Sequence, residues 1–102
     1  MTSVYAERSG HRCILSAQGH ATGSEQVCAA VSGLLYALAG YLTNAIRERY
    51  IEFYKNEMED GSVLLDFNGD EATTAAFTMT VIGLQQIAQS YPDFLQVEYR
   101  KE

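Results

Sequence analysis

The first part of the chain has the alternating apolar and polar pattern of β-strands. Residues Val4–Arg8 alternate weakly, and residues 9–11, Ser-Gly-His, form a turn signal. In Arg12–Gln18 the alternation is clearer, with Ile14 as its exception. Two such runs joined by a short turn predict an antiparallel hairpin.

Residues 19–24, Gly-His-Ala-Thr-Gly-Ser, are predicted to be a loop that leads into a long helix. Ser24 is a suitable N-cap, and the helix is predicted from Glu25 to about Arg49. Its apolar residues recur at spacings of three and four. The stripe expected to be buried consists of Val27, Val31, Leu34, Leu38, Tyr41, Leu42 and Ala45. Small residues that would permit close approach of another element are Gly33, Ala37 and Gly40.

The second half of the chain repeats the order of strands followed by a helix. A strand-like pattern begins at Ile51, and Asp60-Gly61 is a tight-turn dipeptide that leads to a strand over Val63–Phe67. Residues 68–70, Asn-Gly-Asp, offer a cap for a helix from Glu71 to about Ser90.

The second helix is expected to end before a proline, and a final strand follows it. Pro92 disfavours helical angles in the residue before it. Leu95–Tyr99 alternates cleanly and is predicted to be the last strand. The helix is expected to bury some of Ala72, Ala75, Ala76, Met79, Ile82, Gly83 and Ile87.

These elements predict a single α+β domain over residues 1–102, in the order β-β-α-β-β-α-β. Because both long helices are amphipathic, we expect them to pack on one face of a small antiparallel or mixed sheet. The chain contains no internal repeat, low-complexity tract or linker that would divide it.

Composition narrows the classes of function. The hydrophobic fraction of 47% is typical of a globular protein. With 13 acidic against 7 basic residues and a net charge of −6, the chain lacks the basic patch of a nucleic-acid-binding protein, so no direct nucleic-acid contact is expected. An acidic surface attracts basic protein segments, which favours a protein substrate.

Location and cofactors are predicted from absences in the sequence. No apolar run is expected to span a membrane, and the N-terminus lacks the basic and apolar regions of a secretory signal, so a cytoplasmic protein is predicted. Its two cysteines are then expected to be free thiols. Neither a CxxC motif nor clustered His/Cys spacing is present. We therefore expect no metal and no cofactor.

His20 and Cys28 are the candidate catalytic residues. Cysteine attacks as a thiolate, which the start of a helix and a neighbouring imidazolium both stabilise. Unpaired amides near Cys28 would stabilise an oxyanion, and Ser32 lies one turn later on the same helical face. No third group that orients His20 is evident, although Glu25 is one option. By spacing alone, such a cysteine is more often a buried small hydrophobe, and such a histidine more often a loop residue.

Two separate segments carry a resemblance to a known family. Gly19-His20-Ala21, followed by Val-Cys-Ala-Ala-Val-Ser over residues 27–32, resembles the signature of the ribosomal-processing cysteine proteases, the Prp family. Residues 83–88 and 91–95 also resemble the second helix and final strand of that family. The resemblance extends over nearly the whole chain, with the elements in the same order.

The resemblance implies both a reaction and a set of site residues. Cys28 would be the nucleophile and His20 the base. The candidate substrate-binding residues beside them are Gly19, Ala21 and Ser32. It further implies a cytosolic homodimeric endopeptidase that removes a short N-terminal extension from a large-subunit ribosomal protein. Some phage capsid or scaffold proteins are trimmed at similar sequences, so a phage structural protein is an alternative substrate.

The loop between the two candidate residues departs from the family pattern. It is shorter than in most family members, and Glu25 takes the place of the family's Asp. This departure bears on substrate identity and gating more than on the Cys-His dyad. The rival hypothesis is a diverged, non-catalytic or phage-associated member of the same fold that binds capsid or scaffold proteins.

Other polar and reactive residues have simpler interpretations. Cys13 alternates with apolar neighbours and is predicted to be a core thiol, and His11 is expected to be solvated in a turn. Glu57, Glu59 and Asp60 are predicted to form a solvated turn, with attraction of a basic substrate segment as the functional alternative.

Overall fold

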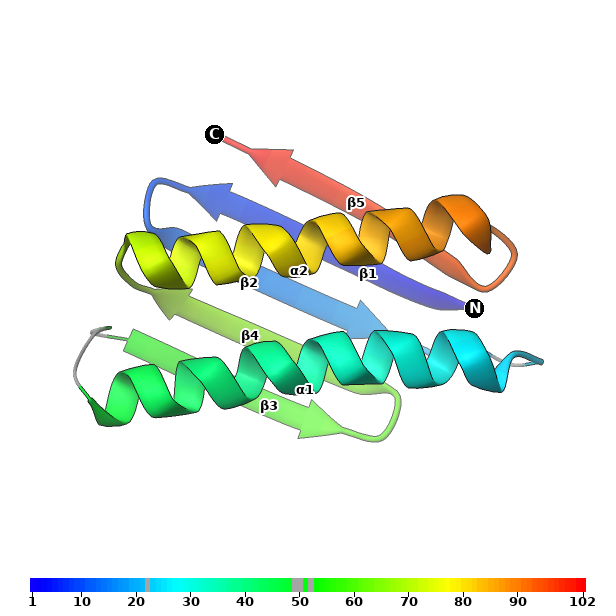
Figure 1. Cartoon of the computed structure of the whole chain (residues 1–102), viewed down its shortest axis with the longest axis horizontal. Helices are drawn as coiled ribbons and strands as arrows, with labels where there is room; N and C mark the ends of the chain where they lie inside the picture. Colours follow the sequence, from blue (N-terminus) through cyan, green and yellow to red (C-terminus); the bar gives the residue numbers. More distant parts are fainter. Residues whose placement is uncertain (22, 49–50, 52) are drawn as a thin grey trace.

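Five strands form one mixed sheet, and both helices lie on the same face of it (Figure 1). The computed structural model describes residues 1–21, 23–48, 51 and 53–102. The elements are β1 (Thr2–Ser9), β2 (Arg12–Gln18), α1 (Glu25–Arg47), β3 (Phe53–Glu59), β4 (Ser62–Asn68), α2 (Glu71–Ser90) and β5 (Leu95–Lys101). The predicted fold class and element order are confirmed. The predicted helix end at Arg49 lies outside the described residues.

The sheet order is β3-β4-β2-β1-β5, which brings distant parts of the sequence side by side. Among the strands that the structure describes, β1 and β5 pair in parallel, and the other three pairs are antiparallel. In the β2–β4 pair Cys13 lies opposite Phe67 and Leu15 opposite Leu65, and all four are fully buried. The core therefore lies between the sheet and the two helices.

Side-chain caps fix where each helix begins. The hydroxyl of Ser24 accepts a hydrogen bond from the amide of Val27 at 3.2 Å. A carboxylate oxygen of Asp70 accepts one from the amide of Thr73 at 2.9 Å. Each cap satisfies an amide that the first helical turn leaves without a partner. Both caps predicted from the sequence are confirmed.

The buried face of α2 differs from the predicted one. Met79 and Ile82 are 71% and 48% exposed, whereas the buried residues are Thr73, Thr74, Phe77, Thr80, Val81 and Leu84. Threonine can be buried on this helix because its hydroxyl donates a hydrogen bond to a backbone carbonyl of the preceding turn, as Thr80 does to Ala76 at 2.9 Å. A pattern that counts threonine as polar therefore assigns the wrong face.

The packing of α1 also corrects two expectations. Tyr41 is exposed, while Leu35 and Ala39 join the buried stripe. Gly33 and Gly40 face open space, so neither they nor the exposed Ala37 provides a close contact. The tight approach between the helices lies instead at Gly83 of α2, where an added Cβ would be 3.0 Å from Leu34 Cδ1.

By length and composition α1 is apolar enough to cross a membrane, contrary to the sequence prediction. Its 23 residues include an uncharged central stretch. Val27, Leu38 and Leu42 of this helix are buried in the core of the domain. A core helix passes the same test of length and composition, so the finding is weak support for a membrane span.

Candidate active site

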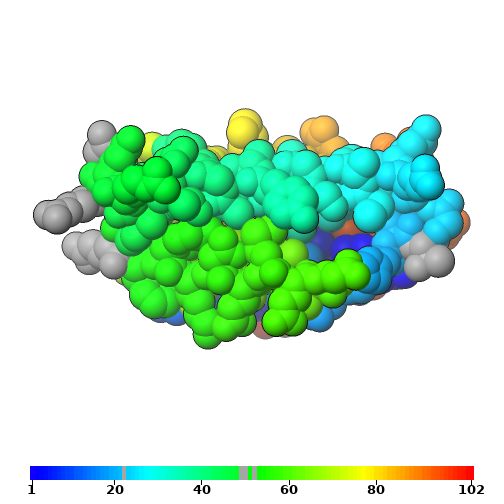
Figure 2. Space-filling view, turned by 90° about the horizontal axis from the view of Figure 1, so that it is seen from below, coloured from blue at the N-terminus to red at the C-terminus, as the bar shows by residue number. Residues whose placement is uncertain are grey.

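A cleft of about 330 Å³ lies between α1 and the end of the β3–β4 hairpin. Figure 2 shows this hollow below the helix, with N-terminal residues at its base. Its apolar lining includes Val31 and Leu35 from α1 together with Met58 and Val63 from the hairpin. Polar groups from four separate segments open into the same space. The cleft therefore has an apolar lining together with polar and ionisable side chains.

Cys28 reaches the cleft from the start of α1 and is exposed, as a reactive thiol must be. Its backbone amide donates to the Ser24 carbonyl at 3.2 Å, and the amide of Val27 donates to the Ser24 hydroxyl. Contrary to the sequence prediction, these two amides are not free to bind an oxyanion. The cap that starts the helix occupies both of them.

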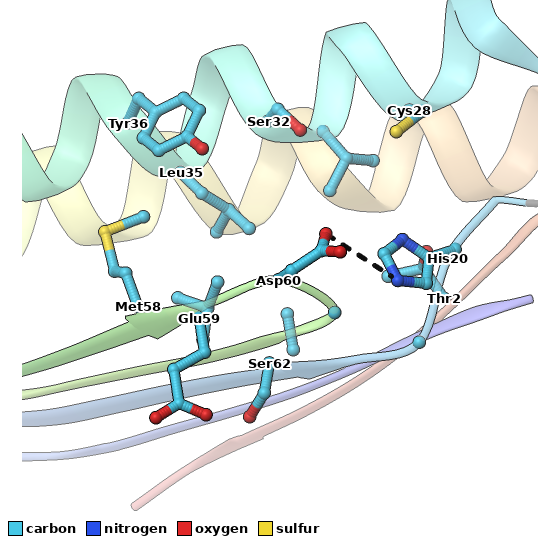
Figure 3. Close-up of a pocket in the computed structure, with 15 residues that line it drawn as sticks. Thr2, His20, Cys28, Ser32, Leu35, Tyr36, Met58, Glu59, Asp60 and Ser62 are labelled. Carbon is cyan, nitrogen blue, oxygen red and sulfur yellow. Dashed lines mark ion pairs between the residues drawn. The ribbon is translucent and has the colours of Figure 1, made fainter.

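His20 reaches the cleft from the loop after β2. The preceding Gly19 has a φ of +91°, a backbone conformation that glycine adopts without a Cβ clash. The amide of Gly19 donates to the carbonyl of Gly61 at 2.9 Å, which ties this loop to the β3–β4 turn. The His20 side chain is 56% exposed, and its Nε2 lies 3.8 Å from Oδ1 of Asp60 (Figure 3).

The structure brings together four of the five predicted site residues. Gly19, His20, Cys28 and Ser32 all line the cleft. Ala21 is buried in the core instead, and its carbonyl accepts a hydrogen bond from the amide of Ser24. The Ala21 side chain is therefore not placed to contact a substrate.

The two candidate catalytic side chains share the cleft without touching. In the described part of the chain, the polar contact of the His20 ring is with Asp60 and not with the Cys28 thiol. Glu25, the option considered for orienting the ring, is exposed at the start of α1 and does not line the cleft. The contribution of Asp60 is not evident from the sequence, because about forty residues separate it from His20.

The other cysteine is unsuited to catalysis. Cys13 is fully buried, which confirms its prediction as a core thiol. Burial raises its pKa to about 11 from an ordinary value of 9.0, and the positive charge of Arg8 offsets part of that rise.

His11 is exposed and hydrogen-bonded to the carbonyl of Gly69. Among the residues that the structure describes, no three His, Cys, Asp or Glu side chains gather as metal ligands.

Comparison with known proteins identifies relatives of the whole domain. Residues 1–96 match the family model for cysteine protease Prp. The fold is similar to that of SMU.848 from Streptococcus mutans, with a TM-score of 0.72 and 21% identity, over 100% of this chain and 96% of that one. No curated protein matches the sequence.

Two further similar structures are of the essential ribosomal processing protease Prp from S. aureus, one with a covalently linked product peptide and one with a substrate peptide. Each has a TM-score of 0.70 and 19% identity, and covers 97% of this chain and 99% of that one. At this identity they establish a shared fold. Because the family match extends over residues 1–96 of 102, the chain belongs to the cysteine protease Prp family, a family of peptide hydrolases.

Proposed function

We propose that this protein is a cytoplasmic cysteine endopeptidase that removes a short N-terminal extension from a large-subunit ribosomal protein, with Cys28 as nucleophile and His20 as general base. The observation that carries the proposal is that both side chains line one cleft, although they come from a loop and a helix. The solved S. aureus protease, with its peptide complexes, supports a protein substrate.

In this mechanism the Cys28 thiol gives its proton to His20, and the resulting thiolate attacks the scissile carbonyl to form a tetrahedral oxyanion. The carbon–nitrogen bond breaks as the imidazolium returns that proton to the leaving amine, leaving an acyl-thioester on Cys28. Water, deprotonated by His20, then hydrolyses the thioester and restores the thiol. Ser32 lines the same cleft and supplies a hydroxyl that can donate to the oxyanion.

His20 must approach Cys28 for this cycle to run. The exposure of its side chain leaves room for the ring to move a short way toward the thiol in the orientation it already has. In structures without substrate, catalytic hydrogen bonds are often long and tighten only in the complex. Glu59 at the rim of the cleft favours a positively charged segment of the substrate.

The test is cleavage of a large-subunit ribosomal protein that carries its N-terminal extension, followed by mass spectrometry of the products. We expect Cys28→Ser and His20→Ala to abolish or strongly reduce cleavage, the latter by about 10²–10⁴-fold. Because Cys28 is exposed, Cys28→Ser should keep the thermal unfolding midpoint of the wild type. Binding of the precursor without cleavage by the wild type would instead favour a non-catalytic binding module.

We propose that the protein forms a homodimer through the outer face of its two helices. Between Glu25 and Arg47, and from residue 72 to residue 90, the sequence has no Asp, Glu, Lys or Arg. The large apolar side chains exposed on this face are Tyr41, Met79 and Ile82. Tyr36 is also exposed but lines the cleft. An uncharged face with these residues is typical of a surface that a partner covers.

The dimer proposal is tested by size-exclusion chromatography with light scattering. We expect Met79→Glu to shift the wild-type dimer toward monomer, because it places a charge in the covered face. The matched control is Gln96→Glu, which adds the same charge at an exposed position on β5. A monomeric wild type, or equal behaviour of the two variants, would contradict this interface.

A further inference from the structure

The β3–β4 turn is joined to the His20 loop by a direct contact. The turn consists of Asp60 and Gly61, between the paired residues Glu59 and Ser62. The carbonyl of Gly61 accepts the hydrogen bond from the amide of Gly19, the residue immediately before His20. The backbone that carries the imidazole is therefore anchored on this turn.

Gly61 forms a surface against which the His20 ring rests. A Cβ added to Gly61 would lie 2.7 Å from Nε2 and 3.4 Å from both Cδ2 and Cε1 of the ring. A contact of 2.7 Å is shorter than side chains tolerate, so a methyl group here requires the ring to move. Gly10, in the turn between β1 and β2, has a similar positive φ of 60° but nothing within 4 Å of an added Cβ.

Asp60 contacts the same nitrogen of the ring. The separation of 3.8 Å between Oδ1 and Nε2 is too long for a hydrogen bond and suits an ion pair with the imidazolium. In Figure 3 the Asp60 carboxylate points toward the ring, whereas the carboxylate of Glu59 points away from it. Asp60 is thus the acidic group of the turn that acts on His20.

The contact at Nε2 determines which nitrogen is left for catalysis. In Figure 3 the other ring nitrogen, Nδ1, lies on the side of the ring nearer Cys28. The negative charge of Asp60, 3.8 Å from Nε2, favours a proton on that nitrogen through its electrostatic field, without a hydrogen bond. Nδ1 is then unprotonated and able to take the proton of the thiol.

We propose that the Asp60-Gly61 turn positions the catalytic imidazole, with Gly61 as the surface that sets the ring's place and Asp60 as the partner that directs Nδ1 toward Cys28. Both are positioning residues, and the inference rests on the function of His20 proposed above. A small displacement of a catalytic group is sufficient to cost a large factor in rate.

The first test compares Gly61→Ala with Gly10→Ala in the peptide-cleavage assay. Both variants place alanine at a positive φ in a two-residue hairpin turn, so they carry similar backbone strain. We expect Gly61→Ala to lower kcat by roughly tenfold or more, because only its methyl group displaces the ring. We expect Gly10→Ala to keep the wild-type kcat, and unfolding midpoints show that both variants are folded.

The second test removes the charge of the turn without altering its backbone. Asp60→Asn creates Asn-Gly, a favoured dipeptide for a tight hairpin turn, so a change in folding is not expected. We expect kcat to fall roughly three- to tenfold with KM unchanged, since the contact is solvent-exposed and a screened ion pair is weak. Asp60→Glu should recover part of the loss.

An NMR measurement separates this inference from the proposed function. The chain has two histidines, so the imidazole signals of His20 can be assigned with His11 as an internal reference. We expect Gly61→Ala and Asp60→Asn to shift the His20 ring signals and leave those of His11 unchanged. If the variants show these His20 shifts but the wild type cleaves no substrate, the protease proposal is overturned and the positioning of the His20 ring by the turn still stands. Unchanged His20 signals, or kcat equal to that of Gly10→Ala, would overturn the positioning role.

Discussion

The two cysteines provide an internal comparison of thiol reactivity in the native protein. When iodoacetamide is added near pH 8, only the thiolate form reacts. Burial raises the pKa of Cys13 from 9.0 to about 11, so its thiolate is about 100-fold less populated than that of an ordinary thiol. The Cys13 side chain is also inaccessible, so alkylation requires the fold to open, whereas Cys28 is exposed. We therefore expect Cys28 to react at least about 100-fold faster than Cys13.

The assay quenches samples over time, digests them and quantifies the two alkylated peptides by mass spectrometry. Full denaturation in urea is the control, because both thiols then lose their native environments and should react at similar rates. At intermediate urea concentrations, labelling of Cys13 should increase with the unfolded fraction. Comparable native rates for both cysteines would refute the reasoning, since they would mean that Cys13 is neither buried nor protected from ionisation.

Three further predictions concern stability. Because burial raises the pKa of Cys13, its contribution to the free energy of unfolding is complete below pH 9.0 and is lost as the pH rises toward about 11. Urea unfolding of the wild type should therefore show up to about 3 kcal/mol of destabilisation over this pH range, and the Cys13→Ala variant should not. Hydrogen bonds from Thr73 lower the pKa of Asp70 below 3.8, so Asp70→Ala should lower the thermal unfolding midpoint at pH 7 and have less effect as the pH falls below 3.8, whereas Asp70→Asn should keep the cap. The buried hydroxyl of Tyr99 has no hydrogen-bond partner in the described part of the chain, so Tyr99→Phe should raise the free energy of unfolding by about 1 kcal/mol, and a clear loss of stability would contradict this.

The strands, helices, caps and turns follow from interactions between residues that are close in the sequence, so they can be predicted from the sequence. Alternation and helical spacing predicted the strands and helices in the observed order, but Glu57 and Glu59, assigned to a turn, belong to β3. The caps at Ser24 and Asp70 were predictable because a capping side chain bonds an amide only three residues away. The turn at Asp60-Gly61 was predictable for a similar reason, and the core position of Cys13 followed from its apolar neighbours. The resemblance to the Prp family rested on short motifs and is confirmed by the family match.

Contacts between distant segments were decided only by the tertiary structure. The predicted face of α2 was wrong because threonine buries its hydroxyl when a carbonyl of its own helix accepts the proton. Ala21 lies beside His20 in sequence, yet its side chain enters the core rather than the cleft. The cleft itself depends on how α1 lies over the β3–β4 hairpin.

The sequence by itself determined the elements, their order and the two candidate catalytic residues. It did not determine that Asp60 and Gly61 lie against His20. Those contacts exist because β4 pairs not only with its sequence neighbour β3 but also with the distant strand β2, which brings the turn of the β3–β4 hairpin beside the end of β2. Local periodicity depends on hydrogen bonds between nearby residues, whereas strand pairing is fixed by burying apolar faces across the whole sheet.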